Sequence, residues 1–200
     1  MMTFTPIMFA RHSQIDAPQS NTLQADNNSV AIDFSGTEAI PFLTTILGLD
    51  LNKLTASGLG VKGTLDGDLN SNYSFALYYF SATAFRFVLH GDGAAQLQAL
   101  ISEQQLRYDI EFVMRTDLAT LTLSGEQAFD ALVDAFKLTP GLRLSDTNSC
   151  YGAQSGEVFI TAIDKQSTQY FQLVAKLPEL EKWQTYLQQR GFAMSLAEVA

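Results

Sequence analysis

Residues 30–43 read VAIDFSGTEAIPFL and residues 119–132 read ATLTLSGEQAFDAL, so the chain contains two versions of one pattern. In both, an alternating apolar run leads into a Ser-Gly pair, and apolar residues at helical spacing follow it. Each version therefore predicts a β-strand, a tight turn and an α-helix. The two glycines, Gly36 and Gly125, stand 89 positions apart.

The predicted elements that follow this pattern also repeat. In the first half a hairpin (residues 74–80 and 84–90) precedes a helix (91–105), and in the second half a hairpin (157–163 and 170–176) precedes a helix (177–192). Phe85 and Phe171, in corresponding hairpin strands, are 86 positions apart, close to the spacing of the glycines. We interpret the chain as an α+β fold made by internal duplication, with pseudo-repeats at about 28–106 and 107–192. A cleft at the seam between the halves is the expected ligand site.

Composition excludes several classes of protein. Of 200 residues, 46% are hydrophobic and 16% are charged, which predicts a folded globular chain rather than a disordered one. No apolar run approaches the roughly 18–20 residues needed to cross a bilayer, and the first twelve residues lack the pattern of a signal peptide. The net charge of −9 and scattered basic residues argue against nucleic acid as a partner. With one cysteine, Cys150, the expected location is the reducing cytoplasm.

The ends of the chain differ in character from the rest. Residues 11–29 are polar, with isolated apolar positions and an Asp-Ala-Pro stretch. We therefore expect residues 1–27 to form a polar arm, residues 28–192 the α+β domain, and residues 193–200 a tail. Residues 108–115, YDIEFVMR, predict a strand that crosses to the second half.

Short motifs offer little chemistry. GLGVKG, at 58–63, matches the dinucleotide pattern, but it follows a predicted helix instead of a strand and is interpreted as a loop. DGDLNSN, at 66–72, spaces oxygen-bearing side chains like a calcium loop, yet Ser71 and Leu77 stand where glycine and glutamate are required. Residues alone thus predict no catalytic set and no metal site. His90, at a strand end, remains open between a structural and a ligand-binding role.

Three stretches resemble the glycine-cleavage T-protein (aminomethyltransferase) family: residues 30–54, residues 73–93 and residues 119–132. The resemblance spans about residues 28–192. It implies a folate-binding fold of two related α+β halves, shared by T-protein, YgfZ-type proteins, dimethylglycine dehydrogenase and the gamma subunit of heterotetrameric sarcosine oxidase. The implied ligand is tetrahydrofolate or a related pteridine.

The departures from the family bear on activity. Tyr73 and Ser74 stand where T-protein has an acidic pair, and neither carries a charge at neutral pH. Gln169 stands nearest the family's pterin-holding glutamate, and His90 stands at the family's asparagine. The resemblance implies folate contacts from these four residues and Tyr151, without independent aminomethyl transfer.

A second function remains open from the same resemblance. The chain is similar in size to the gamma subunit of sarcosine oxidase, which implies a non-catalytic interaction subunit bound to a larger oxidoreductase. Its expected signature is a large exposed apolar patch. An active aminomethyltransferase is a third possibility, but it requires acidic residues that the matching positions lack.

Overall fold

A computed structural model of the chain describes residues 20–52, 60–66, 72–136, 149–165 and 168–195, and for 149–155, 162–165 and 168–169 only the backbone. These residues form four helices: α1 (Ala39–Thr45), α3 (Gly91–Gln104), α4 (Ala128–Phe136) and α5 (Leu177–Gln188). They also form eleven strands: β1 (Thr22–Ala25), β2 (Ser29–Ser35), β3 (Gly60–Asp66), β4 (Asn72–Ser81), β5 (Ala84–His90), β6 (Glu111–Met114), β7 (Leu118–Ser124), β8 (Ser149–Ser155), β9 (Val158–Lys165), β10 (Thr168–Lys176) and β11 (Ala193–Met194).

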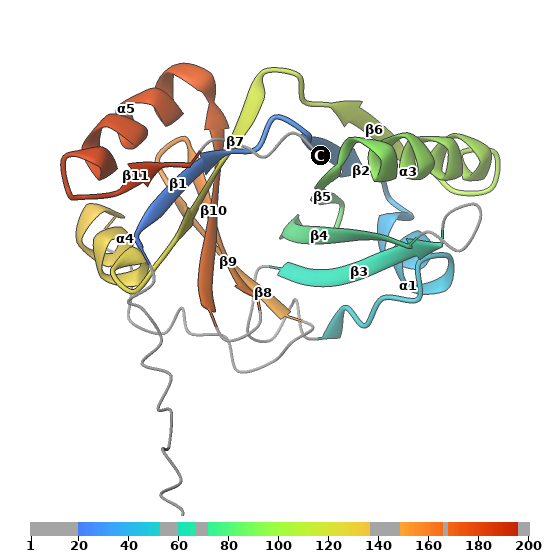
Figure 1. The fold of residues 1–200 in the computed structure, drawn as a ribbon. Coiled ribbons are helices and arrows are strands. Elements are labelled where there is room, and N and C mark those ends of the chain that lie inside the picture. Colours follow the sequence, from blue (N-terminus) through green and yellow to red (C-terminus); the bar gives the residue numbers. More distant parts are fainter. Residues whose placement is uncertain (1–19, 53–59, 67–71, 137–148, 166–167, 196–200) are drawn as a thin grey trace, which may run out of the picture.

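The strands form two sheets that meet at one short ladder. The first sheet has the order β3-β4-β5-β2-β6 and the second has the order β8-β9-β10-β7-β1-β11. They join where β3 pairs with β8, Gly60 opposite Cys150 and Val61 opposite Ser149. Figure 1 shows α1 and α3 on one outer side of the molecule and α4 and α5 on the other, with the strands between them. The chain is thus an α+β protein.

Equivalent positions in the two halves make equivalent contacts. Ser35 of β2 pairs with Glu111 of β6 in the first sheet, and Ser124 of β7 pairs with Thr22 of β1 in the second. The backbone N–H of Arg115 donates to the carbonyl of Ala31 at 2.9 Å, while that of Asp26 donates to Thr120 at 3.0 Å. Each residue lies 89 positions from its counterpart, the same offset as the two glycines.

The short strands β1 and β6 are exchanged between the halves. β1 directly precedes β2 in the chain but pairs with β7, and β6 directly precedes β7 but pairs with β2. In Figure 1 the blue β1 accordingly lies beside the second-half strands. The predicted polar arm, 1–27, is therefore wrong at Thr22–Ala25, and the predicted tail, 193–200, is wrong at Ala193–Met194, which pairs with β1. Such short strands contain too few residues to produce an alternating pattern.

Each half has its own apolar core on the helix side of its sheet. In the first half the ring of Phe34 lies 5.2 Å from that of Phe42 and 5.6 Å from that of Phe87. In the second half Phe171 and Leu173 of β10 pack among buried residues of α4 and α5. These apolar faces account for the helical and strand periods in the sequence.

A third, smaller cluster joins the two sheets on their opposite faces, which we call the seam faces. It contains Tyr78 and Val88 from the first half and Phe159 and Val174 from the second, and the rings of Tyr78 and Phe159 are 4.6 Å apart. Because side chains alternate along a strand, the odd residues of β4 from Tyr73 to Tyr79 pack against the helix-side core while Ala76 and Tyr78 face the seam. No helix among the described residues is long and apolar enough to span a membrane.

The two short motifs lie in or between strands. Gly60–Gly63 of GLGVKG belong to β3, so the interpretation of this segment as a loop is wrong for these four residues, and residues 58–59 lie outside the described ones. In DGDLNSN, Asp66 ends β3 and Asn72 begins β4, while residues 67–71 lie outside the described part of the chain.

A charged cluster crosses the outer end of the first sheet's seam face. The Asp33 carboxylate accepts from Arg86 Nε at 2.6 Å and from Arg115 Nη1 at 2.6 Å, and Arg115 Nε donates to Asp117 at 2.8 Å. Burial opposes ionisation of Asp33, but the hydrogen bonds and charges of the two arginines outweigh it and lower the pKa of this carboxyl. The bond to Arg115 lowers the pKa of Asp117 to about 2.

Replacing Asp33 by asparagine should destabilise the protein in a pH-dependent way. The folded-state pKa is lowered, so the stabilisation by the carboxylate is present above the unfolded value of about 3.9 and is lost as the pH falls through the folded value. We expect Asp33→Asn to cost about 1–3 kcal/mol at pH 7 and progressively less below pH 4. Urea unfolding at pH 7, 4 and 2.5 measures this, and a gap that stays constant with pH would contradict the assignment to charge.

Candidate functional site

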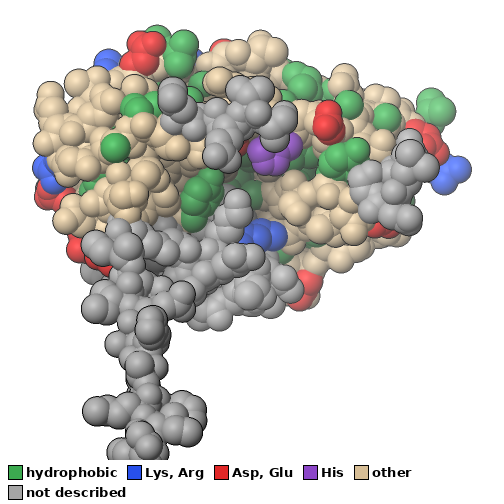
Figure 2. Space-filling view, viewed as in Figure 1, with side chains coloured by type: hydrophobic (Ala, Val, Ile, Leu, Met, Phe, Trp, Pro, Cys, Tyr) green, Lys and Arg blue, Asp and Glu red, His purple; other side chains and the backbone are tan. Residues whose placement is uncertain are grey.

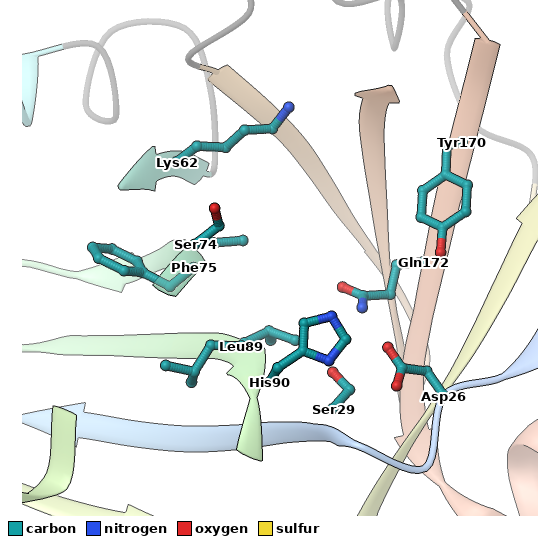
Figure 3. A pocket seen from close by; sticks show the side chains of 11 residues that line it. Asp26, Ser29, Lys62, Ser74, Phe75, Leu89, His90, Tyr170 and Gln172 are labelled. Atoms are coloured by element: carbon teal, nitrogen blue, oxygen red, sulfur yellow. The ribbon is translucent and has the colours of Figure 1, made fainter. Parts of the chain in front are cut away.

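A pocket of about 340 Å³ opens where the two seam faces diverge. We call it the seam pocket, and both halves line it: Lys62, Ser74, Phe75, Ala76, Val88, Leu89 and His90 from the first, Tyr170 and Gln172 from the second, and Asp26 and Ser29 at the ends of the β1–β2 turn. Figure 3 shows Gln172 and Tyr170 on β10 across the pocket from Ser74 and His90. Figure 2 shows the same face hollowed between the halves, with apolar, histidine and basic side chains around the hollow.

Two of the predicted site residues, His90 and Ser74, line this pocket. His90 is the last residue of β5, pairs with Ser29 across the ladder and immediately precedes α3, so its exposed side chain projects at the strand end. Ser74 lies on β4 with its side chain toward the pocket (Figure 3).

Tyr73 does not line the pocket. Its side chain packs with the helix-side core, against the start of α3, where a Cβ placed on Gly93 would lie 2.8 Å from the Cβ of Tyr73. The alternation of side chains along β4 separates Tyr73 from its neighbour Ser74. The remaining two predicted residues, Gln169 on β10 and Tyr151 on β8, have side chains outside the described part of the structure.

The sequence did not predict the pocket residues of β10 or those of the turn before β2. Asp26 falls in the segment predicted as an arm, and Tyr170 and Gln172 lie in a strand that was treated only as part of a hairpin. The pattern YFQLVAK contained a signal, because polar Tyr170 and Gln172 alternate with apolar Phe171 and Leu173. In a buried strand this alternation places the two polar side chains on the same, non-core face.

Gln172 is the most buried polar residue of the pocket wall. Gln172 is 7% exposed, and its Oε1 has no hydrogen-bond partner among the residues that the structure describes. On the neighbouring strand, directly opposite, lies Thr161, which is fully buried and whose Oγ1 also lacks a partner within the described part of the chain. A buried acceptor without a donor carries a desolvation cost, so this wall is suited to a ligand that brings a hydrogen-bond donor.

Tyr170 adds a phenol hydroxyl at the same wall. Burial raises the pKa of Tyr170, the nearby charge of Asp26 raises it further, and a hydrogen bond with Thr122 acts in the opposite direction. The Tyr170 hydroxyl therefore stays protonated at neutral pH and can donate or accept a hydrogen bond. The Asp26 carboxylate accepts from the backbone N–H of Asn28 at 3.2 Å, which holds the β1–β2 turn in place.

A second hollow of about 570 Å³ adjoins the seam pocket, lined by the segment after α1 and by β3 and β4. The two hollows share Lys62, Ser74 and Phe75. Together the lining groups include amide, hydroxyl, imidazole and apolar surface, an arrangement typical of small-molecule binding sites. No group of three His, Cys, Asp or Glu side chains that could hold a metal occurs within the described ranges.

The fold has counterparts among solved structures. One is the glycine cleavage system aminomethyltransferase T from Bartonella henselae, with a TM-score of 0.66 and 21% identity over 84% of this chain and 45% of that chain. Another is heterotetrameric sarcosine oxidase from Corynebacterium sp. U-96, in complex with pyrrole 2-carboxylate, with a TM-score of 0.60 and 15% identity over 90% of this chain and 88% of that one.

The chain thus spans less than half the length of the aminomethyltransferase and most of the length of the sarcosine oxidase chain. No family model matches the sequence. At these identities the similarity concerns the fold, and the chain has the fold of T-protein and of this sarcosine oxidase chain.

Proposed function

We propose that the seam pocket binds tetrahydrofolate or a related pteridine. The observation that carries this proposal is the unpaired, buried Oε1 of Gln172 in a pocket between two halves with the T-protein fold. A pterin ring is flat, has apolar faces and presents N–H groups at its edge. The pocket offers apolar side chains for the faces and acceptors for the N–H groups, in a volume within the range of small-molecule sites.

We further propose that the chain does not transfer aminomethyl groups on its own. Where the resemblance places the acidic pair of T-protein, this chain has Tyr73, which packs into the core, and Ser74, which reaches the pocket but carries no charge. His90 and Ser74 are the proposed ligand contacts from the first half, and Gln169 and Tyr151 remain proposed contacts from the second.

The matching contacts of the two halves support an origin by duplication, with repeats at about 28–106 and 107–192. We propose that the protein binds this ligand in the cytoplasm.

Titration calorimetry with 5-formyl-tetrahydrofolate tests the proposal. We expect a dissociation constant below 1 mM, equivalent to about 4 kcal/mol or more of binding free energy. His90→Ala should weaken binding about fivefold through loss of a hydrogen bond, whereas His90→Asn, which keeps a donor and an acceptor, should retain most of it. Absence of heat at millimolar ligand would count against the proposal. Equal affinity in both variants and the wild type would count against the role of His90.

A second candidate function is that of an interaction subunit of a larger oxidoreductase. It is favoured by the coverage of 88% of a chain from a heterotetrameric enzyme. Apolar side chains are also exposed on the first sheet, where Phe80 of β4 is 43% and Val113 of β6 is 58% exposed. Co-purification of the tagged chain with one oxidoreductase subunit at fixed stoichiometry would support this function, and a monomer with no partner in the same cells would oppose it.

A further inference from the structure

We infer that Gln172 recognises the ligand of the seam pocket through its neutral carboxamide, so that the pocket prefers an uncharged ring to one that binds as a cation. The preferred ring presents an N–H donor beside a carbonyl acceptor. This inference rests on the proposed function, because it concerns the ring chemistry accepted by the same pocket.

Gln172 is placed so that its carboxamide faces the pocket. Its side chain extends from β10 into the pocket toward His90 (Figure 3), is 7% exposed and has an unpaired Oε1. Leaving a buried acceptor unpaired destabilises the protein without ligand, whereas an apolar side chain of similar size would not. The acceptor is therefore satisfied when a ligand donor reaches it.

The carboxamide of Gln172 is suited to a neutral ring. An amide presents an acceptor and donors in one plane, which matches a lactam edge where N–H and C=O are adjacent. Thr161, the cross-strand neighbour, is fully buried and does not itself line the pocket, and its hydroxyl is also neutral. Neither group offers a full negative charge to a cationic ring that has lost its hydration.

The two charged residues that line the pocket, Asp26 and Lys62, lie on either side of Gln172. Asp26 accepts a hydrogen bond within its own turn, and Lys62 lies on the opposite wall, on β3. Figure 3 shows the Gln172 amide between these two residues and close to the imidazole of His90. The group that meets the ring edge at this position is therefore neutral, while the two formal charges on either side oppose each other in sign.

The test uses two ring compounds, 2-amino-4-oxopteridine and 2,4-diaminopteridine, titrated by fluorescence at pH 7 against the full chain. The wild type should bind the 4-oxo compound more tightly than the diamino compound, and the reverse order would overturn the inference. Gln172→Leu should weaken binding of both about tenfold or more, because the amide partner is lost. Gln172→Glu should raise the affinity for the diamino compound relative to the 4-oxo compound about tenfold. In that variant the carboxyl proton can move to a ring nitrogen, which leaves a carboxylate paired with a cationic ring.

Gln104 provides a matched control. It lies in α3, is 8% exposed and also has an unpaired Oε1, but it does not line the seam pocket. Gln104→Leu should leave both affinities unchanged. Thermal unfolding without ligand shows whether each variant is folded. If Gln172→Leu does not fold, Gln172→Glu still tests the same residue.

The outcomes separate the two proposals. Binding of the 4-oxo compound that is unchanged in Gln172→Leu, or a ratio of affinities that is unchanged in Gln172→Glu, would overturn the inference and leave the proposed function standing. Absence of binding of either compound to the wild type would overturn both.

Discussion

Replacing Gly36 by alanine is expected to destabilise the protein by about 3–5 kcal/mol. Gly36 follows β2 with φ +144°, a backbone conformation that residues with a Cβ rarely adopt. A Cβ at this position would lie 2.1 Å from the carbonyl oxygen of Asp109 and 2.7 Å from the Cα of Ile110. Both are backbone atoms of the segment that enters β6, so relief requires the edge strand to move.

The same substitution at Gly125 should have a similar effect. Gly125 has φ +124°, and its Cβ would lie 2.4 Å from Asn21 Oδ1 and 2.7 Å from the Cα of Asn21. Asn21 Oδ1 accepts from the N–H of Gln127 at 3.1 Å, so the clash would also break the contact between this turn and the segment before β1. The Gly36 turn therefore contacts the segment that leads into β6, and the Gly125 turn contacts the segment that leads into β1.

Gly48 is the control for both variants. It also has a positive φ, +63°, but a Cβ there would meet nothing within 4 Å. Gly48→Ala should therefore cost only the backbone term, about 1–2 kcal/mol. Urea unfolding followed by circular dichroism measures all three. If Gly36→Ala were no more destabilising than Gly48→Ala, close packing of the turn against the β6 segment would be refuted.

Leu23→Ala is expected to cost about 2–4 kcal/mol, although Leu23 lies in a segment whose sequence is otherwise polar. Leu23 is fully buried and packs with Leu121, Leu123 and other residues of the second-half core. Shortening it would leave a cavity beneath β1, which is held by pairing with β7 on one side and β11 on the other.

Leu106→Ala is the matched comparison, since Leu106 is 93% exposed. Its substitution should change stability by no more than about 0.5 kcal/mol. The difference between the two leucines in urea unfolding tests whether β1 is part of the core. Equal small effects would restore the description of this segment as an arm.

Local patterns in the sequence were sufficient for the helices and the long strands. The alternation before Gly36 and Gly125, and the helical spacing after them, arise from side chains that face one core, and β2, α1, β7 and α4 lie where these patterns predict. The aromatic hairpin is also present, with Phe75 opposite Leu89 in the β4–β5 ladder. Burial of one face imposes a period on neighbouring residues, and a period can be read without knowing the partner.

Only some of the residues of the seam pocket could be predicted from the sequence. His90 was recognised because it ends a strand just before a turn, where side chains reach a cleft, and Ser74 was identified by resemblance to a family motif. Gln172 was missed because its importance lies in the absence of a partner inside the folded protein, and no sequence pattern expresses that. Tyr73 was proposed beside Ser74, yet adjacent residues of a strand face opposite sides of the sheet.

The chain's period-two and period-3.6 patterns, together with the spacing of Gly36 and Gly125, were enough to predict two similar α+β halves. The exchange of β1 and β6 between those halves emerged only in the folded molecule, where each strand pairs with a strand 76 to 102 residues away instead of with its chain neighbour. Backbone hydrogen bonds hold these pairs, and every residue except proline carries the same backbone donor and acceptor. The side chains therefore do not identify the partner strand, and the pocket residues Asp26, Tyr170 and Gln172 were found only in the structure.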